Sequence, residues 1–455
     1  MQIAVIGTGY VGLVSGVCFS EFGFHVTCVD KDGDKIAKLQ QQIMPIYEPG
    51  LEQLVANNRK AGRLSFSTDL KQALGNADVV IIAVGTPSNA TDGMPDLTAL
   101  HAAIKEVATT LNKHAVIIIK STVPVGSNRE LSKMVTESNP ELDFDLVSNP
   151  EFLREGNAIK DFMTPDRIVV GIDSKRVCET MQKLYAPICL NGAQLFFTTF
   201  ESAELIKYAS NCMLASRVAF INEMANICEK TGANIRDVAR GIGMDERIGD
   251  KFLNPGPGFG GSCFPKDALA LQQIAKKLEC PSQLLDAIID SNEKRKRLMA
   301  QRIIATCDGD VKGKTLSVLG VTFKPGTDDM RESPSLTIIP ELLKAGASIR
   351  VYDPEGIPEA KKLLTGDITW CDDSYAAMEG ADALIILTEW NEFRSLNIKK
   401  VKTLLNDPLV IDLRNIYKRQ DMQKYGFHYV SIGRQDVIPG QPWIPDLNMD
   451  DEKVA

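Results

Sequence analysis

The chain has 455 residues, of which 44% are hydrophobic and 24% charged, a balance typical of a globular protein with two or three domains. Lysine and arginine number 51 against 59 aspartates and glutamates, so the net charge of -8 argues against a broad basic surface for nucleic acid. Because the sequence starts without a basic leader and has no apolar run of roughly 18 residues, we expect a cytoplasmic protein with no membrane span.

The sequence lacks the residue patterns that are typical of a disulfide scaffold or a metal site. Ten cysteines are too few for a disulfide scaffold in a chain of this length, and none stands in a Cys-x-x-Cys pair. The four histidines lack the spacing of a metal site, so we expect no bound metal. Acid–base chemistry must therefore depend mainly on carboxylates, lysine or water.

Residues 1–199 alternate short apolar strands with helical stretches. Strand, glycine turn and helix follow one another from 3 to 22, and a second strand ends at Asp30. Continuous runs rich in β-branched residues at 77–87 and 115–122 are typical of strands that helices cover on both faces. These runs predict a parallel sheet.

A second α/β half is indicated near the carboxyl end, where a similar order of signals returns at 315–320, 349–353 and 381–388. Between the halves, residues 200–230 contain neither glycine nor proline and predict one helix, roughly 45 Å long at 1.5 Å per residue. We therefore predict an α/β fold of two Rossmann-like parallel-sheet domains joined by a long central helix. The predicted parts are a first domain at 1–199, a central helical region at 200–305, a second domain at 306–440 and a flexible tail at 441–455.

The glycine turn has the spacing and context of a dinucleotide site. Gly7-x-Gly9-x-x-Gly12 follows a strand and opens a helix, and Asp30 ends the next strand 18 residues after the last glycine. Such glycines let the backbone approach a pyrophosphate at the helix amino end, and the acidic residue accepts ribose hydroxyls. A carboxylate repels a 2′-phosphate, so the motif predicts NAD, although Lys31 leaves NADP open.

Two further patterns are candidates for catalysis. Cys263 stands in the glycine-rich loop 258–267 just before a helix predicted from about Asp267 to Lys277, and the amino end of a helix can lower a thiol pKa; a small residue buried in a tight turn is an equal alternative. Glu204, Lys207 and Asn211 share one side of the central helix. A lysine beside an amide can stabilise an oxygen that gains charge, although a solvated polar face explains the same spacing.

Two loop segments, 120–124 and 148–156, carry polar residues near predicted strands. Ligands of open parallel sheets gather at the carboxyl ends of strands, so both segments can border a bound nicotinamide. Each is equally compatible with an ordinary turn.

Taken together and in order, five motifs of this chain resemble those of the UDP-glucose 6-dehydrogenases in the nucleotide-sugar dehydrogenase family. They are Gly7-Thr8-Gly9-Tyr10-Val11-Gly12, Lys120-Ser121-Thr122-Val123-Pro124, Asn149-Pro150-Glu151-Phe152-Leu153-x-Glu155-Gly156, Glu204-Leu205-x-Lys207-Tyr208-x-x-Asn211 and Gly260-Gly261-x-Cys263-Phe264-Pro265-Lys266-Asp267. The resemblance implies an amino-terminal NAD domain, a central helix that builds a homodimer and a carboxyl-terminal domain for the UDP moiety. It also implies four-electron oxidation of UDP-glucose by two NAD to UDP-glucuronate, through a covalent cysteine thiohemiacetal and thioester.

The resemblance implies roles for individual residues, with Cys263 as the nucleophile that captures the C6 aldehyde. The implied catalytic residues are Cys263, Lys207, Asn211, Asp267, Thr122 and Glu151. The implied NAD-binding residues are Gly7, Gly9, Tyr10, Val11, Gly12, Asp30, Lys35, Thr86, Thr122, Glu155, Lys266 and Arg331. The implied residues for the UDP-sugar are Glu151, Phe152, Leu153, Lys207, Asn211, Arg247, Phe259, Gly260, Lys324 and Arg414, with Arg247 reaching across from the partner subunit.

Other functions compete with this interpretation. GDP-mannose and UDP-N-acetylmannosamine dehydrogenases share most of the motifs, although the Cys-Phe-Pro-Lys-Asp and Phe-Leu-x-Glu-Gly stretches favour UDP-glucose. A two-electron dehydrogenase of the β-hydroxyacid type also joins an NAD domain to a helical domain, but it needs neither the cysteine nor the second α/β half. A catalytically silent NAD-binding or scaffolding protein would bind cofactor without turnover.

Overall fold

The computed structural model describes residues 1–89 and 92–442, so most of the predicted tail at 441–455 lies outside the described residues. The chain divides into two compact units. The first contains residues 1–211 and 269–282, and the second contains residues 212–268 and the chain from 283 onward. Each unit has its own sheet.

The sheet of the first unit has eight strands in the order β3-β2-β1-β4-β5-β6-β7-β8. In chain order they are β1 (Gln2–Ile6), β2 (His25–Val29), β3 (Leu64–Ser67), β4 (Val79–Ile82), β5 (Ala115–Ile119), β6 (Phe144–Ser148), β7 (Arg167–Gly171) and β8 (Gln194–Thr198). Neighbouring strands are parallel except β6 and β7, which meet antiparallel at Ser148 and Gly171. The predicted parallel sheet is therefore confirmed for all other pairs.

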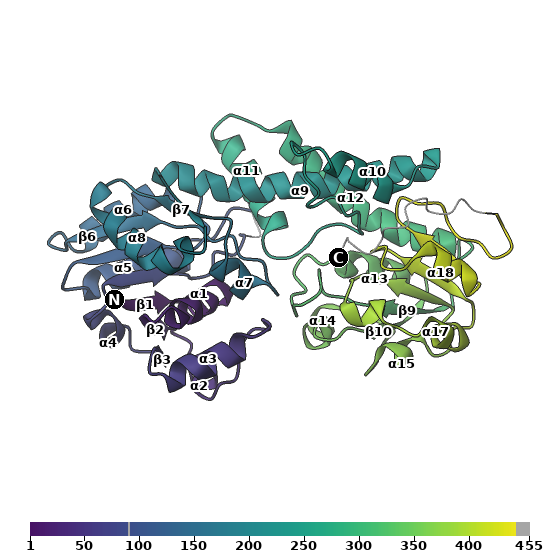
Figure 1. Cartoon of the computed structure of the whole chain (residues 1–455), viewed down its shortest axis with the longest axis horizontal. Coiled ribbons are helices and arrows are strands. Elements are labelled where there is room, and N and C mark those ends of the chain that lie inside the picture. Colours follow the sequence, from purple (N-terminus) through teal and green to yellow (C-terminus); the bar gives the residue numbers. More distant parts are fainter. Residues whose placement is uncertain (90–91, 443–455) are drawn as a thin grey trace. The chain divides into compact units, whose positions relative to one another are not determined.

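Helices cover this sheet on both faces because successive strand residues point to opposite sides. Ile3 and Val5 of β1 belong to a core with residues of α1, α3, α7 and α8, whereas Ala4 and Ile6 pack with α4, α5 and α6 (Figure 1). The helices are α1 (Tyr10–Glu21), α2 (Gly33–Gln40), α3 (Leu51–Lys60), α4 (Leu70–Gly75), α5 (Thr98–Thr110), α6 (Ser127–Ser138), α7 (Ala158–Met163), a 3-10 turn (Lys175–Val177) and α8 (Cys178–Cys189).

One long helix, α9 (Phe200–Thr231), confirms the helix predicted for residues 200–230 (Figure 1). Its first twelve residues belong to the first unit and the remainder to the second. Three further helices follow it: α10 (Ile235–Gly243), α11 (Phe264–Lys277) and α12 (Gln283–Thr306).

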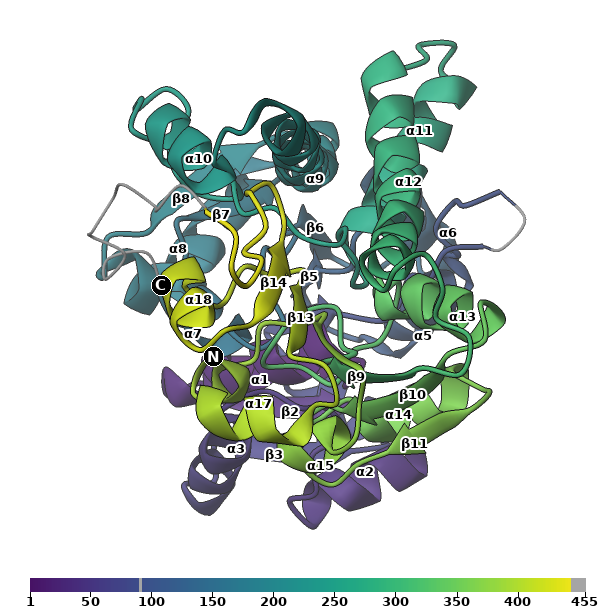
Figure 2. The same cartoon turned by 90° about the vertical axis from the view of Figure 1, so that its right-hand side faces the viewer.

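The second unit contains a six-stranded parallel sheet in the order β11-β10-β9-β12-β13-β14, as predicted for a second Rossmann-like half. The strands are β9 (Thr315–Leu319), β10 (Ser348–Tyr352), β11 (Ile368–Trp370), β12 (Ala383–Ile386), β13 (Leu409–Asp412) and β14 (His428–Ser431). The helices are α13 (Ser335–Lys344), α14 (Ile357–Leu363), α15 (Ser374–Met378), α16 (Asn391–Arg394), α17 (Ile398–Leu404) and α18 (Arg419–Lys424). Met299, Ala300 and Ile303 of α12 share a core with α13, and the two helices lie side by side in Figure 2.

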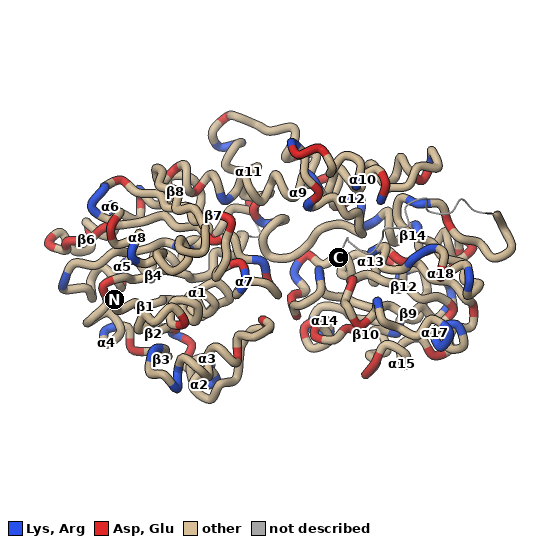
Figure 3. Tube along the Cα trace, viewed as in Figure 1, with Lys and Arg blue, Asp and Glu red and all other residues tan. Residues whose placement is uncertain are grey.

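The strand order reverses at one place in each sheet, between β1 and β4 in the first and between β9 and β12 in the second. In open α/β sheets the loops after two such strands leave toward opposite faces, and ligands bind at the carboxyl ends of these strands. Basic and acidic residues are interspersed along both units (Figure 3). Within the described part of the chain, no helix has both the length and the apolar character needed to cross a bilayer.

Candidate active site

The three glycines of the first turn serve two different purposes. Gly7 has a positive φ of 95°, and a Cβ atom there would lie 2.7 Å from the carbonyl oxygen of Ala83; a Cβ atom at Gly12 would lie 2.0 Å from the carbonyl oxygen of Gly7. At Gly9 a Cβ atom would meet none of the described atoms within 4 Å. Gly7 and Gly12 therefore close the turn, and Gly9 leaves open space beside the amino end of α1, which fits the pyrophosphate of NAD.

Asp30, at the carboxyl end of β2, carries a carboxylate that is well supplied with donors. Its Oδ2 atom accepts hydrogen bonds from the Thr8 amide at 2.9 Å and the Thr8 hydroxyl at 2.8 Å, and lies 3.1 Å from Lys35 Nζ. Burial alone raises the pKa of Asp30, but the hydrogen bonds from Thr8, Asp32 and Lys35 outweigh it and lower the pKa to about 2. The carboxylate is thus ionised at neutral pH and suited to accept ribose hydroxyls, while Lys35 is its ion-pair partner.

The loops that follow β4 and β5 are tied together at the carboxyl edge of the sheet. Thr86 Oγ1 donates to the carbonyl oxygen of Thr122 at 2.9 Å, and Ser121 Oγ donates to that of Val84 at 2.7 Å. Two predicted NAD residues from separate loops, Thr86 and Thr122, therefore lie in contact.

A buried ion pair joins α9 to the segment after β6. Lys207 Nζ donates to Glu151 Oε1 at 2.9 Å, and the other carboxylate oxygen accepts the Leu153 amide at 2.5 Å. Both side chains are under 10% exposed, and the Lys207 amine also lies 5.4 Å from the ring centre of Phe152. The predicted polar residues Lys207 and Glu151 thus form one unit, and the neighbouring Asn211 is buried as well.

A second buried amine, to which the sequence analysis gave no role of its own, belongs to the segment 120–124. Lys120 Nζ donates to Asn149 Oδ1 at 3.0 Å, and the Tyr185 hydroxyl donates to the same oxygen. Burial is the main cause that lowers the pKa of Lys120 to about 8; Glu151 raises it and Lys207 lowers it. The available signal was that Lys120 and Asn149 directly follow adjacent strands, β5 and β6.

Glu204 has a different role from its neighbours on α9. Its carboxylate accepts the Gly126 amide at 2.6 Å and the amide and side chain of Asn128 at 2.8 and 2.6 Å, so it caps the amino end of α6. Burial raises the pKa of Glu204, against the opposing effect of these donors. The polar helix face thus combines an anchor at Glu204 with the buried pair at Lys207.

In the second unit, Cys263 directly precedes α11. Its carbonyl oxygen accepts the Asp267 amide at 2.8 Å, the hydrogen bond that begins the helix. The side chain is half-buried, with Ser262 Oγ 3.5 Å from the sulfur atom. The ten cysteines, all of which are described, form no disulfide. A thiol at a helix amino end faces partial positive charge, which favours the thiolate.

The loop before Cys263 requires its glycines. A Cβ atom at Gly260 would lie 2.4 Å from the carbonyl oxygen of Glu332, and one at Gly261, where φ is 83°, would lie 2.7 Å from the ring of Phe323. The Gly261 amide donates to the Arg331 carbonyl oxygen at 2.8 Å. The cysteine loop is therefore pressed against the segment 323–332.

Helix α12 and helix α9 hold the start of this loop. Asn292 bonds both the amide and the carbonyl oxygen of Phe259, at 2.8 and 3.0 Å. Arg295 Nε donates to the Gly256 carbonyl oxygen at 3.0 Å, and Asn222 Oδ1 accepts the Gly256 amide at 2.8 Å. Three buried side chains thus fix the backbone that leads to the cysteine.

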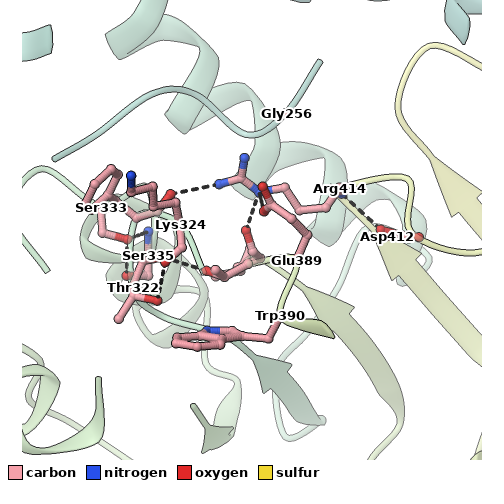
Figure 4. A network of polar contacts seen from close by, with 12 residues as sticks. Gly256, Thr322, Lys324, Ser333, Ser335, Glu389, Trp390, Asp412 and Arg414 are labelled. Atoms are coloured by element: carbon pink, nitrogen blue, oxygen red, sulfur yellow. Dashed lines mark hydrogen bonds and ion pairs between the residues drawn. The ribbon is translucent and has the colours of Figure 1, made fainter. Parts of the chain in front are cut away.

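Figure 4 shows Arg414 in the middle of a polar network at the carboxyl ends of the second sheet. Its guanidinium donates to the carbonyl oxygens of Leu387 at 2.7 Å and Phe323 at 3.2 Å, and lies 3.0 Å from Glu389 Oε2. A Cβ atom at Gly256 would lie 3.0 Å from this guanidinium. Arg414 therefore adjoins the same segment, 323–332, that supports the cysteine loop and contains Lys324.

Four further predicted residues lie on the surface of the second unit or at the start of α11. Arg247 is 88% exposed and pairs with Asp245, and Arg331 is 62% exposed and pairs with Asp329. Lys266 pairs with the buried Asp267 at 2.7 Å. Lys207 belongs to the first unit and Cys263 to the second.

Comparison with known families matches three consecutive parts of the chain. Residues 1–189 match the NAD binding domain of the UDP-glucose/GDP-mannose dehydrogenase family, residues 201–294 its central domain and residues 317–419 its UDP binding domain.

Individual relatives cover nearly the whole chain. It is 52% identical over 438 residues to a UDP-glucose 6-dehydrogenase of Rhizobium meliloti (strain 1021), covering 96% of this chain and 100% of the relative. It is 48% identical over 454 residues to UDP-glucose 6-dehydrogenase TuaD of Bacillus subtilis (strain 168), covering 99% and 97%. A UDP-glucose dehydrogenase structure from the archaeon Pyrobaculum islandicum superposes with a TM-score of 0.85 and 34% identity over 91% and 94% of the two chains. A UDP-D-ManNAc dehydrogenase structure from Pyrococcus horikoshii gives 0.83 and 27% over 96% and 100%.

Substitutions in the glycine turn separate ligand access from folding. Gly9→Ala fills open space, so we expect an unchanged melting temperature and at least about tenfold weaker NAD binding, measured by calorimetry. Gly12→Ala collides with backbone, so we expect a melting temperature lower by several degrees. Wild-type NAD affinity in Gly9→Ala would contradict the assignment of this space.

The buried amine of Lys120 predicts a dependence of stability on pH. The folded chain loses this proton near pH 8 and the unfolded chain near 10.5, so the unfolded state binds more protons between these values. We expect the free energy of unfolding of wild type, relative to Lys120→Met, to rise across this window with a slope approaching about 1.4 kcal/mol per pH unit. Denaturant titrations from pH 7 to 10.5 measure it, and a flat or falling difference would contradict the burial of this amine.

Proposed function

Because the chain belongs to the UDP-glucose/GDP-mannose dehydrogenase family and is an NAD-dependent dehydrogenase, we propose that it oxidises the C6 alcohol of UDP-glucose to the carboxylate of UDP-glucuronate. The matches confirm the predicted family and the NAD cofactor. The two relatives named UDP-glucose 6-dehydrogenase support this substrate. The observation that supports oxidation as far as the acid is Cys263 at the amino end of α11.

The first oxidation removes a proton and a hydride from C6. Lys207 and Asn211, one turn apart on α9, stabilise the C6 oxygen as negative charge develops on it. Glu151 orients the Lys207 amine through their 2.9 Å hydrogen bond. When bound, NAD accepts the hydride at each oxidation, so two NAD are consumed for every sugar.

The aldehyde that results is held covalently. The Cys263 thiolate adds to C6, the new alkoxide takes a proton, and the thiohemiacetal then loses a second hydride and a proton to become a thioester. Water attacks the thioester carbon, the C–S bond breaks, and the thiol and carboxylate are released. For Asp267, in the first turn of α11, and for Lys207 the resemblance implies help with proton transfer or with the positioning of this water.

The second unit binds the UDP part of the substrate. Its family match is to a UDP binding domain, and Lys324 and Arg414 supply cationic groups beside the loop that leads to Cys263. The other residues of the predicted NAD and sugar sites keep the roles that the resemblance implies. A second candidate substrate is UDP-N-acetylmannosamine, because the Pyrococcus horikoshii likeness is nearly as high in TM-score, at 0.83.

The proposed assembly is a homodimer built on α9. In the second unit, Met213, Phe220 and Ile227 are 63%, 48% and 53% exposed. They are spaced seven residues apart and therefore form one apolar stripe along the helix.

We also propose a cytoplasmic location, supported by ten cysteines without a disulfide.

Replacement of the nucleophile tests the covalent route. Wild type should release two NADH for each UDP-glucose, and Cys263→Ala should form no UDP-glucuronate by mass spectrometry while NAD affinity stays within about twofold. Cys280→Ala, which changes an exposed cysteine, is the matched control and should retain activity. Acid formation by Cys263→Ala at the wild-type rate would refute the covalent route. A panel of nucleotide sugars, tested with the wild type, identifies the substrate.

A charge on the apolar stripe tests the dimer. Phe220→Glu should raise the dissociation constant at least about thirtyfold, as expected for a central interface aromatic, measured by sedimentation. Leu363→Glu changes a comparably exposed apolar residue of α14 and should leave the mass unchanged. A monomeric wild type, or an unaffected Phe220→Glu dimer, would exclude this interface.

A further inference from the structure

Glu48 is a buried carboxylate that the proposed mechanism does not use. It lies in the connection between α2 and α3 and is only 6% exposed. Its Oε2 atom accepts hydrogen bonds from the Tyr10 hydroxyl and from the Gly156 amide, the latter at 2.7 Å. Its Oε1 atom accepts the amides of Ala158 at 2.8 Å and Ile159 at 3.4 Å. One side chain thus satisfies four donors from two distant segments.

The two segments and the connection each contain or adjoin a residue that is predicted to bind NAD. Tyr10 begins α1 and stands between Gly9 and Val11 of the dinucleotide motif. Gly156 directly follows Glu155, a predicted NAD residue. The connection that carries Glu48 follows α2, which contains Lys35, the ion-pair partner of Asp30.

We propose that Glu48 is a positioning residue for the dinucleotide, which holds the first turn of α1 and the segment 155–158 at the separation that NAD requires. The inference rests on the NAD site at the glycine turn. It assigns the Tyr10 hydroxyl to this internal network, so that Tyr10 meets the cofactor through its backbone.

The chemistry of the contact explains why a carboxylate is needed. All four partners are donors toward Glu48, and a carboxylate is an acceptor at both oxygens. The Tyr10 hydroxyl stays protonated and able to donate, because burial, followed by the hydrogen bond and the charge of Glu48, raises the pKa of Tyr10. A glutamine would replace one of these oxygens by an NH2 group, and the two donors on that side would lose the carboxylate oxygen that accepts them.

The test compares Glu48→Gln and Tyr10→Phe with the exposed control Glu52→Gln on α3. We expect Glu48→Gln to weaken NAD binding about tenfold by calorimetry without sugar, and to raise the KM for NAD equally. At saturating NAD, kcat should change less than about twofold, and UDP-glucose affinity should be unchanged. Tyr10→Phe keeps the carboxylate–amide bonds and should give a smaller loss, about threefold.

A purely structural role predicts a different pattern. If Glu48→Gln lowers the melting temperature but leaves the dissociation constant for NAD at the Glu52→Gln value, the proposal is wrong. If that variant fails to fold, an unchanged NAD affinity in folded Tyr10→Phe overturns the proposal, and the threefold loss supports it. Because NAD binding is measured without sugar, an error in the proposed substrate would leave these results intact.

Discussion

Both candidate binding regions depend on a glycine that lets the loop after one strand pass directly over the end of its neighbour. At Gly7, φ is 95° and a Cβ atom would lie 2.7 Å from the Ala83 carbonyl oxygen. At Gly320, φ is 83° and a Cβ atom would lie 2.5 Å from Thr388 Cβ. A larger residue would force apart the loops at the point where strand order reverses, so both regions depend on this close approach of the two loops.

The two sheets use the acidic residue after their second strand in different ways. Asp30 shares its carboxylate with Thr8 and Lys35 and remains partly exposed, so it is available to a ribose. Asp353 is only 2% exposed and accepts hydrogen bonds from the amides of Val321 and Thr322 and from the indole of Trp390. Its carboxylate is therefore engaged within its own domain. The same topology therefore serves NAD in one half, whereas UDP in the other must depend on other groups.

Buried polar residues at the start of helix α9 hold the helix to neighbouring parts of the first unit. Glu204 fixes the helix to the amino end of α6, and three residues later Lys207 pairs with Glu151. Taking an amine out of water costs several kcal/mol unless oxygen atoms surround it, so the carboxylate beside Lys207 and the amide beside Lys120 are needed to keep these amines buried in the folded chain. A site assembled this way is preorganised, because its charges cannot relax into solvent.

Local patterns determined much of this protein by themselves: the strands, the glycine turn, the central helix and the cysteine before α11 each lie within a short stretch of contiguous residues, where periodicity and residue type suffice. The residues that hold the site together could not be predicted from local patterns. Glu48 meets Gly156 across 108 positions, and the spacing of Glu204 and Lys207 fits both a solvated face and a buried anchor. Only the tertiary structure decided between these, because the role of a polar side chain depends on which distant donors and acceptors the fold brings to it once water is excluded.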